Sequence, residues 1–157
     1  MEGCRVSAVP SWLLILVLLV LPLLAINPSP EDYAWMMRLN RPPWLVGLQV
    51  WTPLLWLVIY AFLLGSALTT WQAEANWRLL LAYPLLLLLI KGHTWLLCRT
   101  HRLDYGAMAC GLSWMYGLGL AVKLIGISPS SAVGLLPFLL WSPVEIWSLW
   151  KMRSMNR

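Results

Sequence analysis

The sequence predicts an all-α integral membrane protein built as a bundle of five transmembrane helices. Three observations carry this prediction. Of the 157 residues, 61% are hydrophobic and only 11% are charged. An ordinary soluble domain is about half apolar and about a quarter charged, so this chain has too few polar side chains to cover its surface in water. The apolar residues also gather into five stretches, each near the roughly 20 residues that a helix needs to cross a bilayer.

The predicted spans follow one another within a single domain that covers residues 1–157. They run over residues 11–26, 45–70, 79–98, 107–127 and 132–150. Proline, charged and polar residues typical of loops separate them at residues 27–30, 41–43, 72–76, 99–104 and 128–131. The alternation of apolar and polar residues that a membrane barrel requires is nearly absent. Helices, which satisfy their own backbone hydrogen bonds in lipid, are therefore favoured.

The first stretch has an alternative interpretation as a secretory signal peptide, because Arg5 precedes its apolar core. Cleavage after Ala25 would place Leu23 where a small residue is preferred. An uncleaved span is therefore the preferred interpretation.

The positive charges predict how the spans are oriented. Arg5, Arg78 and Lys123 fall on one side of the predicted topology, and Lys91 falls inside a span. The other side holds more cations, namely Arg38, Arg41, Arg99, Arg102, Lys151, Arg153 and Arg157. The positive-inside rule then places the N-terminus outside and the C-terminus in the cytoplasm. The same positions, scattered beside apolar runs, explain the net charge of +5 without nucleic acid as a partner.

Motifs of soluble-type enzymes are absent from the sequence. Cys4, Cys98 and Cys110 have no CxxC spacing, and neither His93 nor His101 has companion ligands at the spacing of a local metal motif. No nucleophile motif or nucleotide-binding loop is present. The sequence therefore predicts no catalytic residues, no metal site and no haem-iron site.

The chain contains 12 tryptophans, which fall into two groups. Most lie near span ends, where indole rings anchor helices at the headgroups; these are Trp12, Trp35, Trp44, Trp71, Trp77, Trp95, Trp147 and Trp150. Trp56, Trp114 and Trp141 lie inside spans, Trp51 lies between the two groups, and Tyr60 follows Trp56 by one turn. Rings inside spans should face the bundle interior, because lipid tails offer no hydrogen-bond partner. There they either pack as core or line a cavity.

Three segments around these aromatic residues form a distinctive pattern. They are Trp35-Met-Met-Arg-Leu-Asn-Arg41-Pro-Pro-Trp44, Trp51-Thr-Pro53 followed by Trp56-x-x-x-Tyr60, and Leu135-Leu-Pro137-Phe138-Leu-Leu-Trp141. Together they resemble the TspO/MBR family of tryptophan-rich sensory and translocator proteins. The resemblance covers essentially the whole chain. It implies a five-helix bundle, often a homodimer, that binds tetrapyrroles such as protoporphyrin. Whether members of this family act as enzymes is contested.

The resemblance also implies a set of ligand-binding residues. Trp56 and Tyr60 match the second-helix motif, Trp141 matches the fifth-helix tryptophan, and Trp44 matches a first-loop tryptophan that could cover the cavity mouth. The full candidate set is Trp44, Trp51, Trp56, Tyr60, Trp95, Trp141 and Glu145. Arg38 and Arg41 lie on the first loop, where they could meet the propionates of a tetrapyrrole.

Departures from the family pattern support an alternative function. Gly92 stands where the family has asparagine on its third helix, and Glu145 replaces a small residue on the fifth. The alternative is a non-catalytic membrane scaffold or assembly subunit that keeps the fold and has lost the pocket.

Two ionisable residues lie inside predicted spans. Charge there costs at least about 2.5–3.5 kcal/mol on insertion scales, so Lys91 and Glu145 should find partners. Both are predicted at similar depth below the cytoplasmic boundary, and we hypothesise an intramembrane ion pair between them. Separate snorkelling to the headgroups is the alternative.

Overall fold

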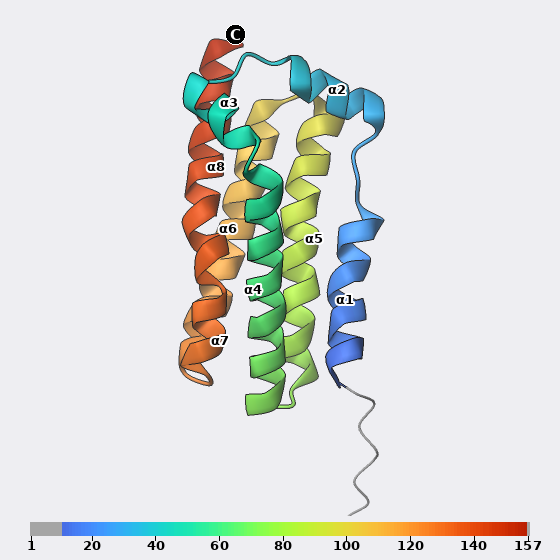
Figure 1. Ribbon diagram of the computed structural model, residues 1–157, viewed down its shortest axis with the longest axis vertical. Coiled ribbons are helices and arrows are strands. Elements are labelled where there is room, and N and C mark those ends of the chain that lie inside the picture. Colours follow the sequence, from blue (N-terminus) through green and yellow to red (C-terminus); the bar gives the residue numbers. More distant parts are fainter. Residues whose placement is uncertain (1–10, 157) are drawn as a thin grey trace, which may run out of the picture.

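The computed structural model describes residues 11–156, and all regular secondary structure in this part of the chain is helical. The helices are α1 (Ser11–Ala25), α2 (Pro30–Arg38), α3 (Pro43–Gln49), α4 (Thr52–Ala73), α5 (Trp77–Thr100), α6 (Leu103–Ile125), α7 (Pro129–Gly134) and α8 (Leu136–Met155). The long helices lie side by side along one axis, and α2 and α3 lie across the end that also carries the C-terminus (Figure 1). We refer to this as the α2–α3 end.

The helices provide four or five membrane spans. Four segments are long and apolar enough to cross a bilayer, namely α4, α5, α6 and the 27-residue segment Pro129–Met155 that contains α7 and α8. A fifth span results if α1 and α2 are taken together, although they meet at an angle of 73°. The predicted helical membrane fold is therefore confirmed.

The second predicted span, residues 45–70, was wrong at its beginning. Residues 43–49 form the separate helix α3, a turn follows at residues 50 and 51, and α4 begins at Thr52. Pro53 lies in the first turn of α4, where its missing N–H is not needed. Hydropathy alone could not detect this break, because residues 45–51 are almost as apolar as the span that follows.

The bend between α1 and α2 has a local cause. Ser29 caps α2 by accepting a hydrogen bond on Oγ from the backbone N–H of Asp32 at 3.1 Å, and Pro30 opens the helix. Proline restricts the preceding residue to extended conformations, which prevents α1 from continuing. As a result, α2 crosses the end of the bundle.

Small residues allow close contact between the helices. A Cβ atom added to Gly117 on α6 would lie 2.6 Å from Cε1 of Phe138 on α8. One added to Gly134 on α7 would lie 2.6 Å from Cβ of Ser66 and 3.0 Å from the carbonyl oxygen of Phe62 on α4. These approaches fit the general use of small residues at membrane helix interfaces.

A polar cluster lies in the half of the bundle away from the α2–α3 end, and we name it the Tyr83 cluster. The Tyr83 hydroxyl is 2.7 Å from both Ser66 Oγ and Thr70 Oγ1. Ser66 donates to the Ser131 carbonyl at 2.6 Å, which joins α4 and α5 to α7. Tyr83 is 1% exposed, so this network replaces the solvent that its hydroxyl has lost.

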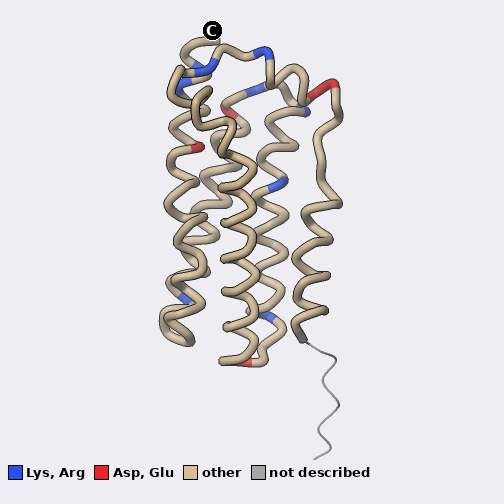
Figure 2. Tube along the Cα trace, viewed as in Figure 1, with Lys and Arg blue, Asp and Glu red and all other residues tan. Residues whose placement is uncertain are grey.

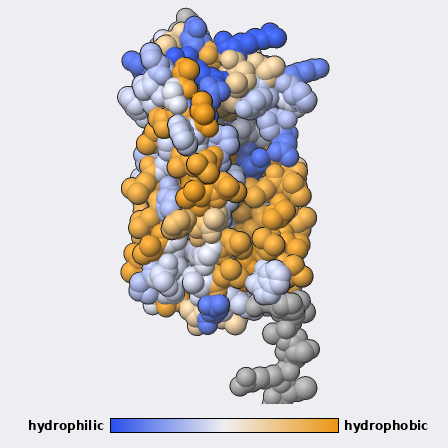
Figure 3. Space-filling view, in the orientation of Figure 1, coloured by the Kyte–Doolittle hydropathy of each residue, from blue (hydrophilic) through white to orange (hydrophobic). Residues whose placement is uncertain are grey.

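The outer surface agrees with a membrane environment. On the face shown in Figure 3, apolar residues cover much of the length of the bundle, and hydrophilic residues gather at the α2–α3 end. Large side chains such as Leu57, Met108 and Leu140 are 64%, 69% and 72% exposed. Lys and Arg are concentrated at the α2–α3 end and are sparse at the other (Figure 2).

Candidate functional site

A cavity of about 470 Å³ opens beneath the α2–α3 end of the bundle. Its walls come from α4, α5 and α8, and its roof comes from α2, α3 and the segment between them. A volume of this size lies within the range of small-molecule pockets. The cavity is thus positioned by the bend after α1 and by the break before α4.

Two sets of hydrogen bonds hold the roof, one within it and one to α8. Arg41 Nη2 donates to the Met36 carbonyl at 2.9 Å, which closes the segment between α2 and α3 on itself. The Asn40 N–H donates to Asn156 Oδ1, and Asn156 Nδ2 donates to the Asn40 carbonyl, both at 2.9 Å. This reciprocal pair ties the roof to the C-terminal end of α8.

Two of the three tryptophans predicted inside spans line this cavity. Trp56 on α4 and Trp141 on α8 contribute aromatic walls. Trp114 does not line it, and its Nε1 donates to the Leu139 carbonyl at 3.1 Å. The alternatives of core packing and cavity lining therefore both occur, for different rings.

The other predicted aromatic residues lie outside the cavity. Tyr60 stacks on Trp56, with ring centroids 5.5 Å apart, but it lines a separate apolar hollow between α1, α4 and α5. Trp44 instead stacks on Trp147 at 4.9 Å, while its neighbours Leu45 and Gln49 contact the cavity. Trp51 and Trp95 are 63% and 42% exposed. The predicted grouping of Trp56, Tyr60 and Trp141 in one cavity was wrong for Tyr60.

The first-loop arginines differ in position. Arg41 lines the cavity, and Arg38 is an exposed residue at the end of α2 that does not. Arg41 is therefore the cation that faces the cavity.

The predicted ion pair between Lys91 and Glu145 is wrong. No ion pair among residues 11–156 joins them. Lys91 Nζ donates to Asn27 Oδ1 at 3.0 Å, in the connection after α1. His93, two residues further along α5, instead lies beside Glu145, since two residues turn a helix by about 200°.

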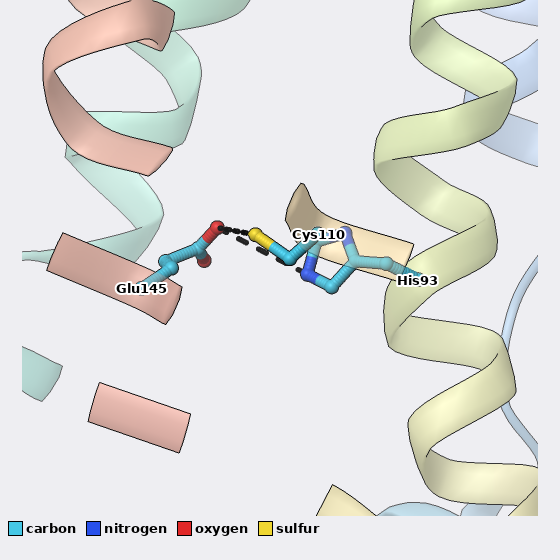
Figure 4. Close-up of side chains that lie close together, drawn as sticks. All are labelled: His93, Cys110 and Glu145. Carbon is cyan, nitrogen blue, oxygen red and sulfur yellow. Dashed lines mark hydrogen bonds and ion pairs between the residues drawn. The ribbon is translucent and has the colours of Figure 1, made fainter. Parts of the chain in front are cut away.

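The structure adds a cluster of His93, Cys110 and Glu145, from α5, α6 and α8. His93 Nε2 is 3.9 Å and Cys110 Sγ is 3.8 Å from Glu145 Oε2 (Figure 4). Local sequence spacing gives no sign of this cluster, because its three residues lie far apart along the chain. Only the packing of three helices brings the residues together.

The cavity also holds polar atoms without partners. Three buried side-chain polar atoms of cavity residues have no hydrogen-bond partner within the described residues, namely Arg41 Nε, His93 Nδ1 and Trp141 Nε1. Unpaired buried polar groups are costly and therefore uncommon. The walls of the cavity therefore keep polar groups that hydrogen bonds within the described residues leave unsatisfied.

The fold and the cavity define a multi-pass helical membrane protein with an aromatic cavity beneath one end of its bundle. The model of the TspO/MBR family matches residues 11–154. The chain therefore belongs to the TspO/MBR family. No curated protein sequence matches the chain significantly.

Proposed function

We propose that this protein binds a flat hydrophobic molecule of the tetrapyrrole class in the cavity beneath the α2–α3 end. In this proposal it serves a sensory, transport or regulatory role rather than a catalytic one. The observation that carries the proposal is the placement of Trp56 and Trp141 on two walls of one cavity. Indole rings offer a flat π-system both apolar area and ring–ring attraction.

Arg41 supports a ligand that carries carboxylates. It lines the cavity from the roof, and its Nε has no hydrogen-bond partner within the described residues. A propionate there would accept hydrogen bonds from the guanidinium, which favours planar, paired contacts with carboxylates. The family resemblance supports the tetrapyrrole class for the same site.

The orientation and the assembly belong to this proposal. We place the α2–α3 end in the cytoplasm, because Lys and Arg concentrate there (Figure 2). The N-terminus then lies outside, and the cavity is reached from the cytoplasmic side. We also propose that residues 1–157 form one domain that assembles as a homodimer, as the family resemblance implies.

The test is a titration of purified protein in detergent with protoporphyrin, followed by quenching of tryptophan fluorescence. We expect saturable binding with a fixed stoichiometry. Trp56→Leu and Trp141→Leu should each weaken affinity about 2- to 13-fold beyond the effect of lost area, which corresponds to about 0.5–1.5 kcal/mol for a stacked ring. Trp95→Leu is the matched control, because Trp95 lies outside the cavity.

Two results would contradict the proposal. Quenching that rises without saturation indicates partitioning into the detergent, and it favours the scaffold function. Equal affinity in the Trp56, Trp141 and Trp95 variants would show that the rings of Trp56 and Trp141 do not stack on the ligand.

A further inference from the structure

His93, Cys110 and Glu145 offer three different donor atoms at one point inside the bundle. One nitrogen, one sulfur and one carboxylate oxygen from these residues lie within 4.8 Å of one another (Figure 4). His93 and Cys110 are buried, with Cys110 1% and His93 5% exposed. Each residue comes from a different helix, so the packing of α5, α6 and α8 fixes their relative positions.

The donor set and its spacing suit zinc. Zn²⁺ binds imidazole nitrogen, thiolate sulfur and carboxylate oxygen at about 2.0–2.3 Å, and such ligands on a tetrahedron lie roughly 3.3–3.6 Å apart. The distances to Glu145 Oε2 are 3.9 Å from His93 Nε2 and 3.8 Å from Cys110 Sγ. Changes of a few tenths of an ångström, within the reach of side-chain rotation, would bring these two pairs of donor atoms to the spacing of zinc ligands.

The position of Glu145 also favours a cation. Its side chain is 21% exposed and lies in a membrane span, where an unpaired charge is costly. Among the described residues no lysine or arginine lies within ion-pair distance of it, and His93 is its one neighbour of that kind. Buried carboxylates are generally paired or bound to metal. A divalent ion would supply the missing charge.

We propose that His93, Cys110 and Glu145 form a binding site for a divalent transition-metal ion, with Zn²⁺ the ion that this donor set favours. On binding, the Cys110 thiol releases its proton to solvent and the thiolate coordinates the ion. His93 and Glu145 also line the cavity, whereas Cys110 is not one of its lining residues. A fourth coordination position can therefore face the cavity, as in zinc sites that keep one position open. This site does not depend on tetrapyrrole binding.

The test uses the purified full-length protein in detergent, stripped of metal with a chelator and titrated with Zn²⁺ alone by calorimetry. We expect one ion per chain. His93→Ala, Cys110→Ser and Glu145→Gln should each weaken affinity about tenfold or more, since even second-shell changes cost that much. Cys98→Ser and His101→Ala are the matched controls and should bind as the unmodified protein does. Cys98 is a second buried thiol, 3.9 Å from Met36 Sδ, and His101 lies 3.4 Å from Asp32 near the surface.

A second measurement keeps all three ligands and so does not depend on how the variants fold. In a Cys4→Ser, Cys98→Ser protein, Cys110 is the remaining cysteine. Titration with Co²⁺ should produce the absorption band of cobalt–thiolate ligation, and Zn²⁺ should remove it. Absence of this band would overturn the proposal and leave a hydrogen-bonded cluster only. Zn²⁺ binding that is unchanged in the three ligand variants, or lost in His101→Ala, would overturn it as well.

Discussion

Two polar regions inside this bundle differ in whether their buried polar atoms have hydrogen-bond partners. In the Tyr83 cluster, hydroxyls from α4 and α5 pair with one another and with a carbonyl of α7 at 2.6–2.7 Å. At the cavity, Arg41 Nε, His93 Nδ1 and Trp141 Nε1 are buried and have no partner among residues 11–156. A satisfied network stabilises the fold, whereas unsatisfied groups are retained at a cost. The comparison indicates that the first region stabilises the fold, and it supports our proposal that the second binds a ligand.

The largest effect is expected where the Tyr83 cluster meets α7. In Gly134→Val the new side chain would overlap Ser66 and the backbone of Phe62, neither of which can move away easily. We expect a loss of about 3 kcal/mol in the free energy of unfolding, at the upper end for overpacking. Denaturation in detergent measures it. Gly111→Val is the control, because a Cβ atom there meets nothing within 4 Å. Equal losses in both variants would show that α7 is not closely packed.

A smaller effect contrasts the two regions directly. Tyr83→Phe leaves Ser66 and Thr70 without their shared partner and should destabilise the protein by about 1–3 kcal/mol. Trp141→Phe removes an N–H that has no partner, so it should cost less stability than Tyr83→Phe. Protoporphyrin affinity should show the opposite order. If Trp141→Phe proves the more destabilising variant, the assignment of the two regions fails.

The smallest effect concerns Lys91, whose hydrogen bond to Asn27 is exposed. Lys91→Met should change stability by less than about 1 kcal/mol, as exposed polar contacts usually do. In a cycle of Lys91→Glu and Glu145→Lys, the losses should add within about 0.5 kcal/mol, because the two residues do not pair. Recovery of stability in the double variant would instead show that the two residues form an ion pair.

The sequence was sufficient for the helical membrane fold because hydropathy and span length report directly on lipid contact. The same signal failed at residues 45–51, which are apolar and yet form the roof of the cavity. Apolar composition does not distinguish a helix that crosses the bilayer from one that lies across the end of a bundle. The length of α4, 22 residues from Thr52, is what separates them.

The candidate site was only partly predictable, because helix rotation is not encoded in spacing along one helix. Trp56 and Tyr60 share a face, but the cavity ends between them and only Trp56 reaches it. Glu145 was predicted to need a partner, and the structure places His93 and Cys110 beside it instead of Lys91. Residues on three helices can be grouped only once the packing of α5, α6 and α8 is known.

The reciprocal hydrogen bonds between Asn40 and Asn156 have a kinetic consequence. They join the C-terminal end of α8 to the covering segment. Under the proposed function, a ligand that leaves past this segment would have to break these hydrogen bonds. Because neither asparagine lines the cavity, the bonds would raise the barriers for entry and exit together. Residence time would then depend on Asn156, while the equilibrium constant would depend on the tryptophans beneath.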